Sequence, residues 1–173
     1  MANPLVNEQQ LYDRIKKEKI TVPIFIWDLM YHYLGDDISA ISQIALAYRR
    51  NNLPIPVADA KKIKEHTIRI NETVNKILRP ELLESDREQI TELKKNDKKL
   101  HPVVNELFCH YIGNDVYGIN LIVGFHIDPT DEKPIPVEYA QKILDRTFTM
   151  NQFMDRLREA TQQQVTIVQE KQT

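Results

Sequence analysis

The chain has 173 residues, a formal net charge of −2 and a pI near 6.2, so it can form one ordinary domain or two very small ones, and it lacks the strong positive charge of a nucleic-acid-binding protein. Its one cysteine, Cys109, excludes an internal disulfide framework and a thiolate metal cluster. The N-terminal residues do not show the pattern of a secretory signal, and no apolar stretch approaches the roughly 20 residues that cross a bilayer, so we expect a cytoplasmic protein with no membrane contact.

Glycine is scarce, with four residues, and the charged and long aliphatic residues are those that favour helix, so we expect an all-α fold. The first half predicts a short charged helix, a long helix and, after a proline-containing turn, a second long helix, at about 7–19, 24–50 and 57–78. The second half predicts the same order at about 85–99, 102–127 and 137–162. Pro56 and Pro136 are expected in the first turn of the second long helices, where a missing N–H would have no partner anyway.

Two short motifs show that the chain repeats itself. Residues 32–37 read HYLGDD, and residues 110–115, 78 positions later, read HYIGND. Further along, PIPV at 54–57 returns at 134–137. The offset thus grows by two residues, and the change falls in polar stretches that are predicted loops. We conclude that the chain is an internal duplication.

The two repeats, 1–84 and 85–173, each predict a helical hairpin with one apolar side. In the second long helix of the first repeat, alternating steps of three and four residues separate the positions that form a coiled-coil seam, which are 60, 63, 67, 70, 74 and 77. One hairpin cannot bury this side alone, whereas two can cover each other. We therefore expect one antiparallel four-helix bundle with an internal pseudo-twofold axis, an intramolecular pseudo-dimer with short flanking helices.

These hairpins resemble the dimerisation and histidine-phosphotransfer domain of sensor histidine kinases. In that family a first helix carries a His-acid-apolar-x-Asn/Thr-Pro/Asp-apolar motif, and a second helix follows after a turn. FCHYIGNDVYGINLIVGF at 108–125 and EYAQKILDRTFTMNQFMDRLREA at 138–160 are similar to these helices, and the first repeat gives a fainter version. Two family hairpins pair into a bundle with a phosphorylatable histidine on the outside of each first helix. The resemblance implies that His32 and His110 occupy the phosphoacceptor position.

Three features depart from the family. Its histidine is followed by an acid that can take the imidazole proton, whereas Tyr33 and Tyr111 stand here, and a phenol with a pKa of about 10 is a poor base at neutral pH. The residue four positions after the histidine can orient an attacking water in the family; it is Asn114 in one copy and, in the other, Asp36, which would repel a phosphoryl group. The sequence shows no glycine-rich phosphate loop or Walker-type motif, so we expect at most a histidine phosphoacceptor and no self-phosphorylation.

The sequence leaves several alternatives open. Gly35 and Gly113 lower helix stability where they stand, so either another element approaches closely or the helix breaks and restarts with Asp36 and Asn114 as N-caps. The histidines accept a phosphoryl group, contact a partner, or keep a helix surface inherited from a kinase ancestor. A metal or haem site between them is disfavoured because the Glu-x-x-His pattern of di-iron bundles is missing, and we expect no metal and no cofactor.

We expect a noncatalytic two-component-type signalling protein that binds a response-regulator receiver domain or a histidine kinase, as a phosphotransfer intermediate or as a decoy. His110 and His32 are the candidate phosphoacceptors, and the second copy is favoured because it matches the family more closely. The alternatives are a receiver phosphatase, in which Asn114 places a water, and a structural helical adaptor. Whether the chain is a monomer or a homodimer stays open. Partner contacts are expected on the outer faces, at Tyr33, Asp36, Asp37, Tyr111 and Asp115.

Overall fold

The computed structural model describes residues 7–78 and 100–162, and within them the chain is almost entirely helical, which confirms the all-α class. The first repeat holds α1 (Glu8–Glu18), α2 (Ile24–Asp28), the π-helical segment η1 (Leu29–Leu34), α3 (Gly35–Arg50) and α4 (Val57–Leu78). The second holds α6 (Pro102–Phe108), η4 (Cys109–Gly113), α7 (Asn114–His126), the strands β1 (Ile127–Asp128) and β2 (Asp131–Glu132), and α8 (Val137–Thr161). The charged helix expected at 85–99 lies outside the described residues.

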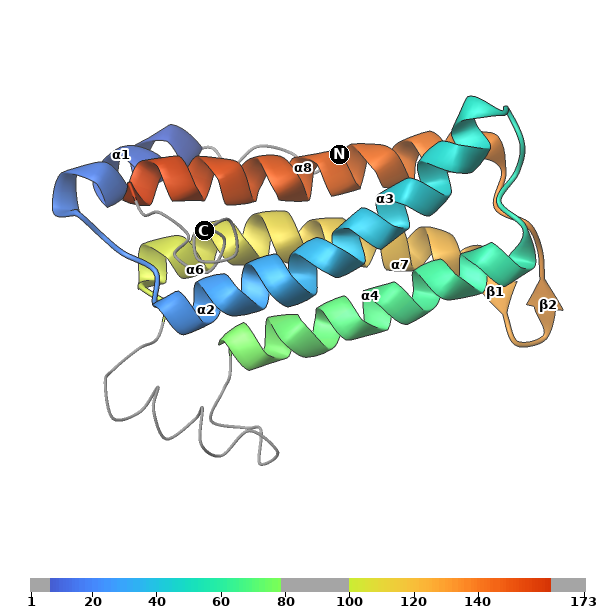
Figure 1. Cartoon of the computed structure of the whole chain (residues 1–173), viewed down its shortest axis with the longest axis horizontal. Helices are drawn as coiled ribbons and strands as arrows, with labels where there is room; N and C mark the ends of the chain where they lie inside the picture. Colours follow the sequence, from blue (N-terminus) through green and yellow to red (C-terminus); the bar gives the residue numbers. More distant parts are fainter. Residues whose placement is uncertain (1–6, 79–99, 163–173) are drawn as a thin grey trace, which may run out of the picture.

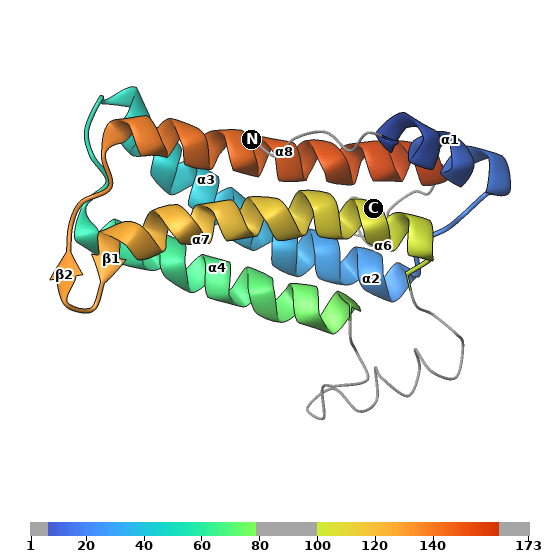
Figure 2. The ribbon, with the colours of Figure 1, turned by 180° about the vertical axis from the view of Figure 1, so that it is seen from behind.

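The long helices form the predicted antiparallel four-helix bundle. The segments α2, η1 and α3 follow one another without a break, as do α6, η4 and α7, so each trio forms one long helix. Both α3 and α7 pack against α4 and against α8, so every long helix touches one helix of its own hairpin and one of the other. Figures 1 and 2 show both hairpin turns at the same end of the bundle, while α1 lies at the opposite end against α8 and α6.

The two copies of PIPV meet at the end of the bundle where both hairpins turn. The backbone N–H of Ile55 donates to the carbonyl of Ile135 at 2.8 Å, and the N–H of Ile135 donates to the carbonyl of Ile55 at 2.9 Å. Both side chains are fully buried. Equivalent residues that exchange the same hydrogen bond are what a twofold axis requires. The prolines on either side of each isoleucine have no N–H, which leaves the isoleucine as the donor.

The positions of two prolines correct one prediction. Pro136 is the N-cap of α8, with an extended ψ of 150°. In the first repeat α4 begins at Val57, directly after Pro56. Both prolines therefore precede the second helices and do not occupy their first turns. The fixed φ of proline still favours this place, because it sets the direction in which the chain enters the helix.

The core follows the predicted seam. Thr67 and Thr147 lie at equivalent positions within it, and each hydroxyl donates to the carbonyl three residues earlier, at 2.7 Å and 2.8 Å. Such a bond satisfies a hydroxyl that is buried among apolar side chains. The apolar seam positions that are buried are Ala60, Ile63, Ile70 and Ile77 in α4, and Ala140, Ile143, Met150, Met154 and Leu157 in α8.

The second repeat has two extra residues in the turn between its long helices, as predicted. This turn contains a short β-hairpin. The strands β1 and β2 pair antiparallel, with Ile127 opposite Glu132. Asp128 Oδ1 accepts from the backbone N–H of Thr130 at 2.8 Å and from its hydroxyl at 2.7 Å, and these bonds hold the pKa of Asp128 below its ordinary value. The sequence predicts no strand here, because a strand of two residues carries no alternation.

Within the described ranges no helix is both long enough and apolar enough to span a membrane.

Candidate functional site

Each repeated hexapeptide begins in a π-helical segment and ends in the α-helix that follows it. His32 lies in η1 and His110 in η4, at the point where each first long helix widens and then returns to α-helical geometry. At the end of η1, the N–H of Gly35 donates to the carbonyl of Met30, five residues earlier. Single π turns inside α-helices are rare and occur frequently at functional sites. The feature that the two copies share is therefore a widened helical turn that carries a histidine.

Neither expectation for the glycines holds. Gly35 and Gly113 both have φ of −58° and right-handed helical ψ, so the helix continues through them, and Asp36 and Asn114 are not N-caps. A Cβ atom on Gly35 would lie 3.5 Å from the carbonyl oxygen of Met30, which is an ordinary contact, and one on Gly113 would meet no atom within 4 Å. No described element approaches either glycine closely.

His110 is half-buried and has two neighbours from its own helix. Its ring lies edge-on to Tyr111, with centroids 4.8 Å apart, and Asn114 Nδ2 lies 3.4 Å from its Nδ1. Tyr111 is buried and stacks on Phe153 of α8 at 5.5 Å. Burial, together with a hydrogen bond to Glu8, raises the pKa of Tyr111 above its ordinary value. Tyr111 is therefore no base for His110, and the expectation that it lies on the outer face is wrong.

His32 has more acidic surroundings. Its Nε2 lies 3.4 Å from Oδ1 of Asp28, one helical turn earlier. Tyr33 is 55 % exposed and Asp36 is exposed, as the sequence predicts. The equivalent of Asp28 in the second repeat is the exposed Glu106, four residues before its histidine.

An acidic residue lies one helical turn before each histidine, and neither acid is among the predicted site residues. Asp28 and Glu106 stand one turn before His32 and His110, and a spacing of four residues places two helical side chains on one face. A carboxylate in this place can accept the imidazole proton, the role that the kinase family gives to the residue after the histidine. The signal was available in the sequence, because an acid stands four residues before the histidine in both repeats.

Asp37 is buried and is not a surface contact. Its Oδ1 lies 2.7 Å from His66 Nδ1 and 3.2 Å from Arg69 Nε, and both partners belong to α4. The side chain therefore ties α3 to the second helix of its own hairpin. The expectation that Asp37 lies on an outer face is wrong, because its position along α3 faces α4.

Asp115, the equivalent of Asp37, is buried completely. Its Oδ1 lies 3.2 Å from Arg146 Nη1 of α8, while its Oδ2 has no hydrogen-bond partner among the described residues. Burial raises the pKa of Asp115 to about 6, and the guanidinium of Arg146 offsets only part of that rise. The expectation that Asp115 lies on an outer face is therefore wrong as well.

Gly118 makes room for the pair. A Cβ atom at this position would lie 2.1 Å from Cζ of Arg146, so only a glycine lets the guanidinium cross α7 to reach Asp115. In the first repeat the equivalent positions hold Ala40 and His66. The smaller imidazole needs no such gap. Each helical hairpin thus has a buried aspartate that pairs with a basic residue of its second long helix. The basic residue is a histidine in the first repeat and an arginine in the second.

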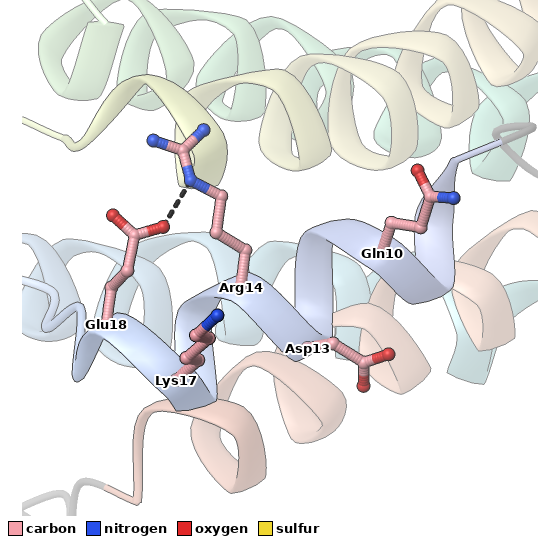
Figure 3. Close-up of a pocket in the computed structure, with 5 residues that line it drawn as sticks. All are labelled: Gln10, Asp13, Arg14, Lys17 and Glu18. Atoms are coloured by element: carbon pink, nitrogen blue, oxygen red, sulfur yellow. Dashed lines mark hydrogen bonds and ion pairs between the residues drawn. The ribbon is translucent and has the colours of Figure 1, made fainter.

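Two shallow hollows occur elsewhere on the described surface. One lies on the outside of α1, where all five lining side chains come from this single helix and carry mixed charge, and where Arg14 pairs with Glu18 (Figure 3). The other lies between α3 and α8, beside the exposed Phe148. Neither hollow includes His32 or His110. No group of three or more histidine, cysteine or acidic side chains is placed to hold a metal ion in the part of the chain that the structure describes.

Comparisons with protein-family models, with curated proteins and with solved structures found no match to this chain.

Proposed function

We propose that this protein is a noncatalytic signalling protein of the two-component type, which binds a receiver domain and exchanges a phosphoryl group with it through His110. The observation that carries the proposal is the position of the two histidines. Each lies partly exposed in a π turn on the first helix of a hairpin, and two such hairpins pair in one bundle. A histidine on the first helix of each of two paired hairpins is the arrangement that the resemblance to histidine-phosphotransfer domains implies.

The chemistry requires one nucleophilic nitrogen and a phosphoryl donor. An imidazole nitrogen of His110 attacks the phosphorus of the receiver's aspartyl phosphate, an N–P bond forms, and the bond from phosphorus to the aspartyl oxygen breaks and releases the carboxylate. The imidazole N–H proton passes to Glu106, one turn away, or to water. The reverse reaction returns the phosphoryl group. No nucleotide is needed, because the receiver supplies the phosphoryl group.

Charge favours His110 over His32 as the acceptor. Around His32 the acids Asp28 and Asp36 stand four residues before and after the ring, whereas Asn114 replaces the second acid beside His110. One further negative charge at about 4 Å opposes a phosphoryl dianion by about 1 kcal/mol per unit charge in water and by about 4 kcal/mol near a protein surface. The second copy therefore offers the better site.

The test uses receiver domains that have been phosphorylated with radiolabelled acetyl phosphate. The full chain should take label in an acid-labile, base-stable form, which is the stability of a phosphoramidate. His110→Gln should remove most of the label, and the matched variant His32→Gln should remove little of it. Label that persists in His110→Gln, or a chain that takes no label from any receiver, would refute the proposal.

A receiver phosphatase is the second candidate, and the position of Asn114 favours it. Its side chain is exposed, and the amide lies 3.4 Å from the His110 ring, where it could hold a water against a docked aspartyl phosphate. In that case Asn114→Ala would slow receiver dephosphorylation while His110→Gln would not. A structural adaptor would show neither effect.

A further inference from the structure

The guanidinium of Arg146 lies beside the candidate phosphoacceptor His110. The two helices that carry them, α8 and α7, run alongside each other (Figure 2). Arg146 Nη1 donates to the carbonyl oxygen of Asn114 at 3.3 Å and to Oδ1 of Asp115 at 3.2 Å. The side-chain amide of the same Asn114 lies 3.4 Å from His110 Nδ1. Asn114 is therefore a neighbour that the guanidinium and the imidazole share.

Electrostatic coupling also joins His110 to the Asp115–Arg146 pair. Burial raises the pKa of Asp115, whereas Arg146 and, to a smaller extent, His110 lower it. An imidazole acts on a carboxylate in this way only when the two groups lie near each other, because the interaction falls with distance. A charge placed on the His110 ring therefore acts on both members of the pair.

Part of the Arg146 guanidinium makes no hydrogen bond to the described residues. An arginine carries five N–H donors, on Nε, Nη1 and Nη2. Here Nη1 makes both bonds, and no described residue accepts from Nη2 or from Nε. A Cβ atom on Gly118 would lie nearest to Cζ, Nε and Nη1, so Nη2 is the nitrogen turned furthest from that point of α7. The side chain is 23 % exposed, so a ligand at the surface can reach it.

The need to pair a buried aspartate does not explain this arginine. In the first repeat His66 pairs with the equivalent Asp37 from the position that Arg146 occupies in the second. A glycine inside a helix lowers stability relative to alanine, and Arg146 requires one at position 118. The second repeat thus accepts a less stable helix in order to bring a guanidinium to this place.

The first repeat uses its own arginine differently. Arg69 Nε donates to Asp37 Oδ1 at 3.2 Å, and Arg69 Nη2 lies 2.9 Å from His66 Nδ1. Both nitrogens therefore have partners inside the first hairpin. The residue equivalent to Arg69 in the second repeat is Thr149. A guanidinium whose Nη2 is unbonded within the described chain thus lies on the His110 side.

We propose that Arg146 binds the phosphoryl group carried by His110 and donates hydrogen bonds from Nη2 to its non-bridging oxygens. The inference rests on the proposed function, because it concerns the group that His110 accepts. A guanidinium suits this role because it stays charged and its donors match phosphoryl oxygens in direction. The bonds to phosphorus form and break as described above, and Arg146 keeps its protons throughout. Its positive charge stabilises the negative charge on the oxygens during transfer.

Chemical phosphorylation of the full chain tests the proposal without a receiver. With potassium phosphoramidate, an imidazole nitrogen attacks phosphorus, the bond from phosphorus to the amide nitrogen breaks, and ammonia leaves, while the imidazole proton passes to ammonia or to solvent. The phosphorus NMR signal that His110→Gln removes belongs to His110, and its shift against pH gives the pKa of that phosphoryl group. Arg146→Met should raise this pKa by about half a unit or more, because a cation at about 6 Å favours the dianion.

Two controls separate binding from a change in the fold. Every protein in the series carries Asp115→Asn, so that Arg146→Met leaves no unpaired buried acid, and circular dichroism verifies that each is folded. Arg146→Lys keeps the charge and should restore part of the shift. Arg69→Met removes the arginine of the first hairpin and should leave the pKa of the phosphoryl group on His110 unchanged.

The outcomes distinguish this inference from the proposed function. The inference would be overturned by a phosphoryl pKa that is the same with and without Arg146, by an equal effect of Arg69→Met, or by a His110 that takes no phosphoryl group from phosphoramidate. A chain that no receiver labels, but whose phosphoryl pKa responds to Arg146, would refute the proposed function and leave the contact standing. A chain that receivers label at His110, but whose phosphoryl pKa ignores Arg146, would refute the contact alone.

Discussion

Replacing Asp115 with asparagine should stabilise the protein near neutral pH and change its stability little in acid. The pKa of Asp115 rises from 3.8 to about 6 on folding. The folded state therefore holds the proton more tightly than the unfolded state does. Protonated Asp115 contributes its full stability below pH 3.8, and that contribution is lost as the pH rises through about 6. Asparagine does not ionise in this pH range, so the Asp115→Asn protein does not lose this stability as the pH rises.

The structure sets the size of the effect. The rise in pKa from 3.8 to about 6 corresponds to about 3 kcal/mol of lost stability once the carboxyl is ionised. The single ion pair with Arg146, at 3.2 Å, does not offset this loss, because the side chain is fully buried and its Oδ2 has no partner among the described residues. Asparagine keeps an oxygen that can accept from Arg146. Asp115→Asn should therefore gain up to about 3 kcal/mol over the parent at neutral pH.

Urea titrations of the parent and of Asp115→Asn across about pH 4 to pH 7 measure this difference. The gap in free energy of unfolding should be small at the acid end and widen as the pH rises. Asp36→Asn, which removes an exposed carboxylate, gives the baseline for the same series. A gap that does not change with pH, or an asparagine variant that is the less stable one at pH 7, would refute the reasoning about this buried acid.

Two further comparisons test the pseudo-twofold bundle and the placement of its tyrosines. Ile55→Pro and Ile135→Pro should each lower the free energy of unfolding by about 3 kcal/mol or more, because each removes one N–H of the same reciprocal bridge. The two losses, measured by urea titration, should agree within about 1 kcal/mol. Clearly unequal losses would count against the pseudo-twofold axis. Tyr111→Ala removes a buried, stacked ring and should lower the free energy of unfolding by about 3 kcal/mol or more. Tyr33→Ala changes the equivalent position of the first repeat, where the ring is 55 % exposed, and should lower it by less than about 1 kcal/mol. Equal losses of melting stability would contradict the different burial of the two rings.

The helices were predictable because their signals are local and repeated. The seam in α4 and α8 follows from apolar spacing, and the duplication follows from the hexapeptides and from PIPV. The bridge between Ile55 and Ile135 was not predictable in the same way, because it joins residues 80 positions apart and no local pattern names its partner. The π turns were missed for a different reason: one widened turn shifts the apolar face by less than the scatter that a helical pattern tolerates.

The site residues show where sequence reasoning fails. An aspartate reads as a surface residue, since a buried acid depends on a partner that the local sequence does not reveal. Asp115 is buried because Arg146, on another helix, reaches it over Gly118. The same limit applies to Tyr111, whose neighbours Phe153 and Glu8 come from opposite ends of the chain. The acids one turn before each histidine, by contrast, could have been found from spacing alone.

The measurement that bears most directly on the proposed role is the position of any phosphoryl group on the chain. After incubation with a phosphorylated receiver, peptide mass spectrometry at neutral to alkaline pH should locate the modification at His110, with little or none at His32. A chain that stays unmodified with every receiver, or a phosphoryl group carried mainly on His32 or on any other residue than His110, would contradict the account.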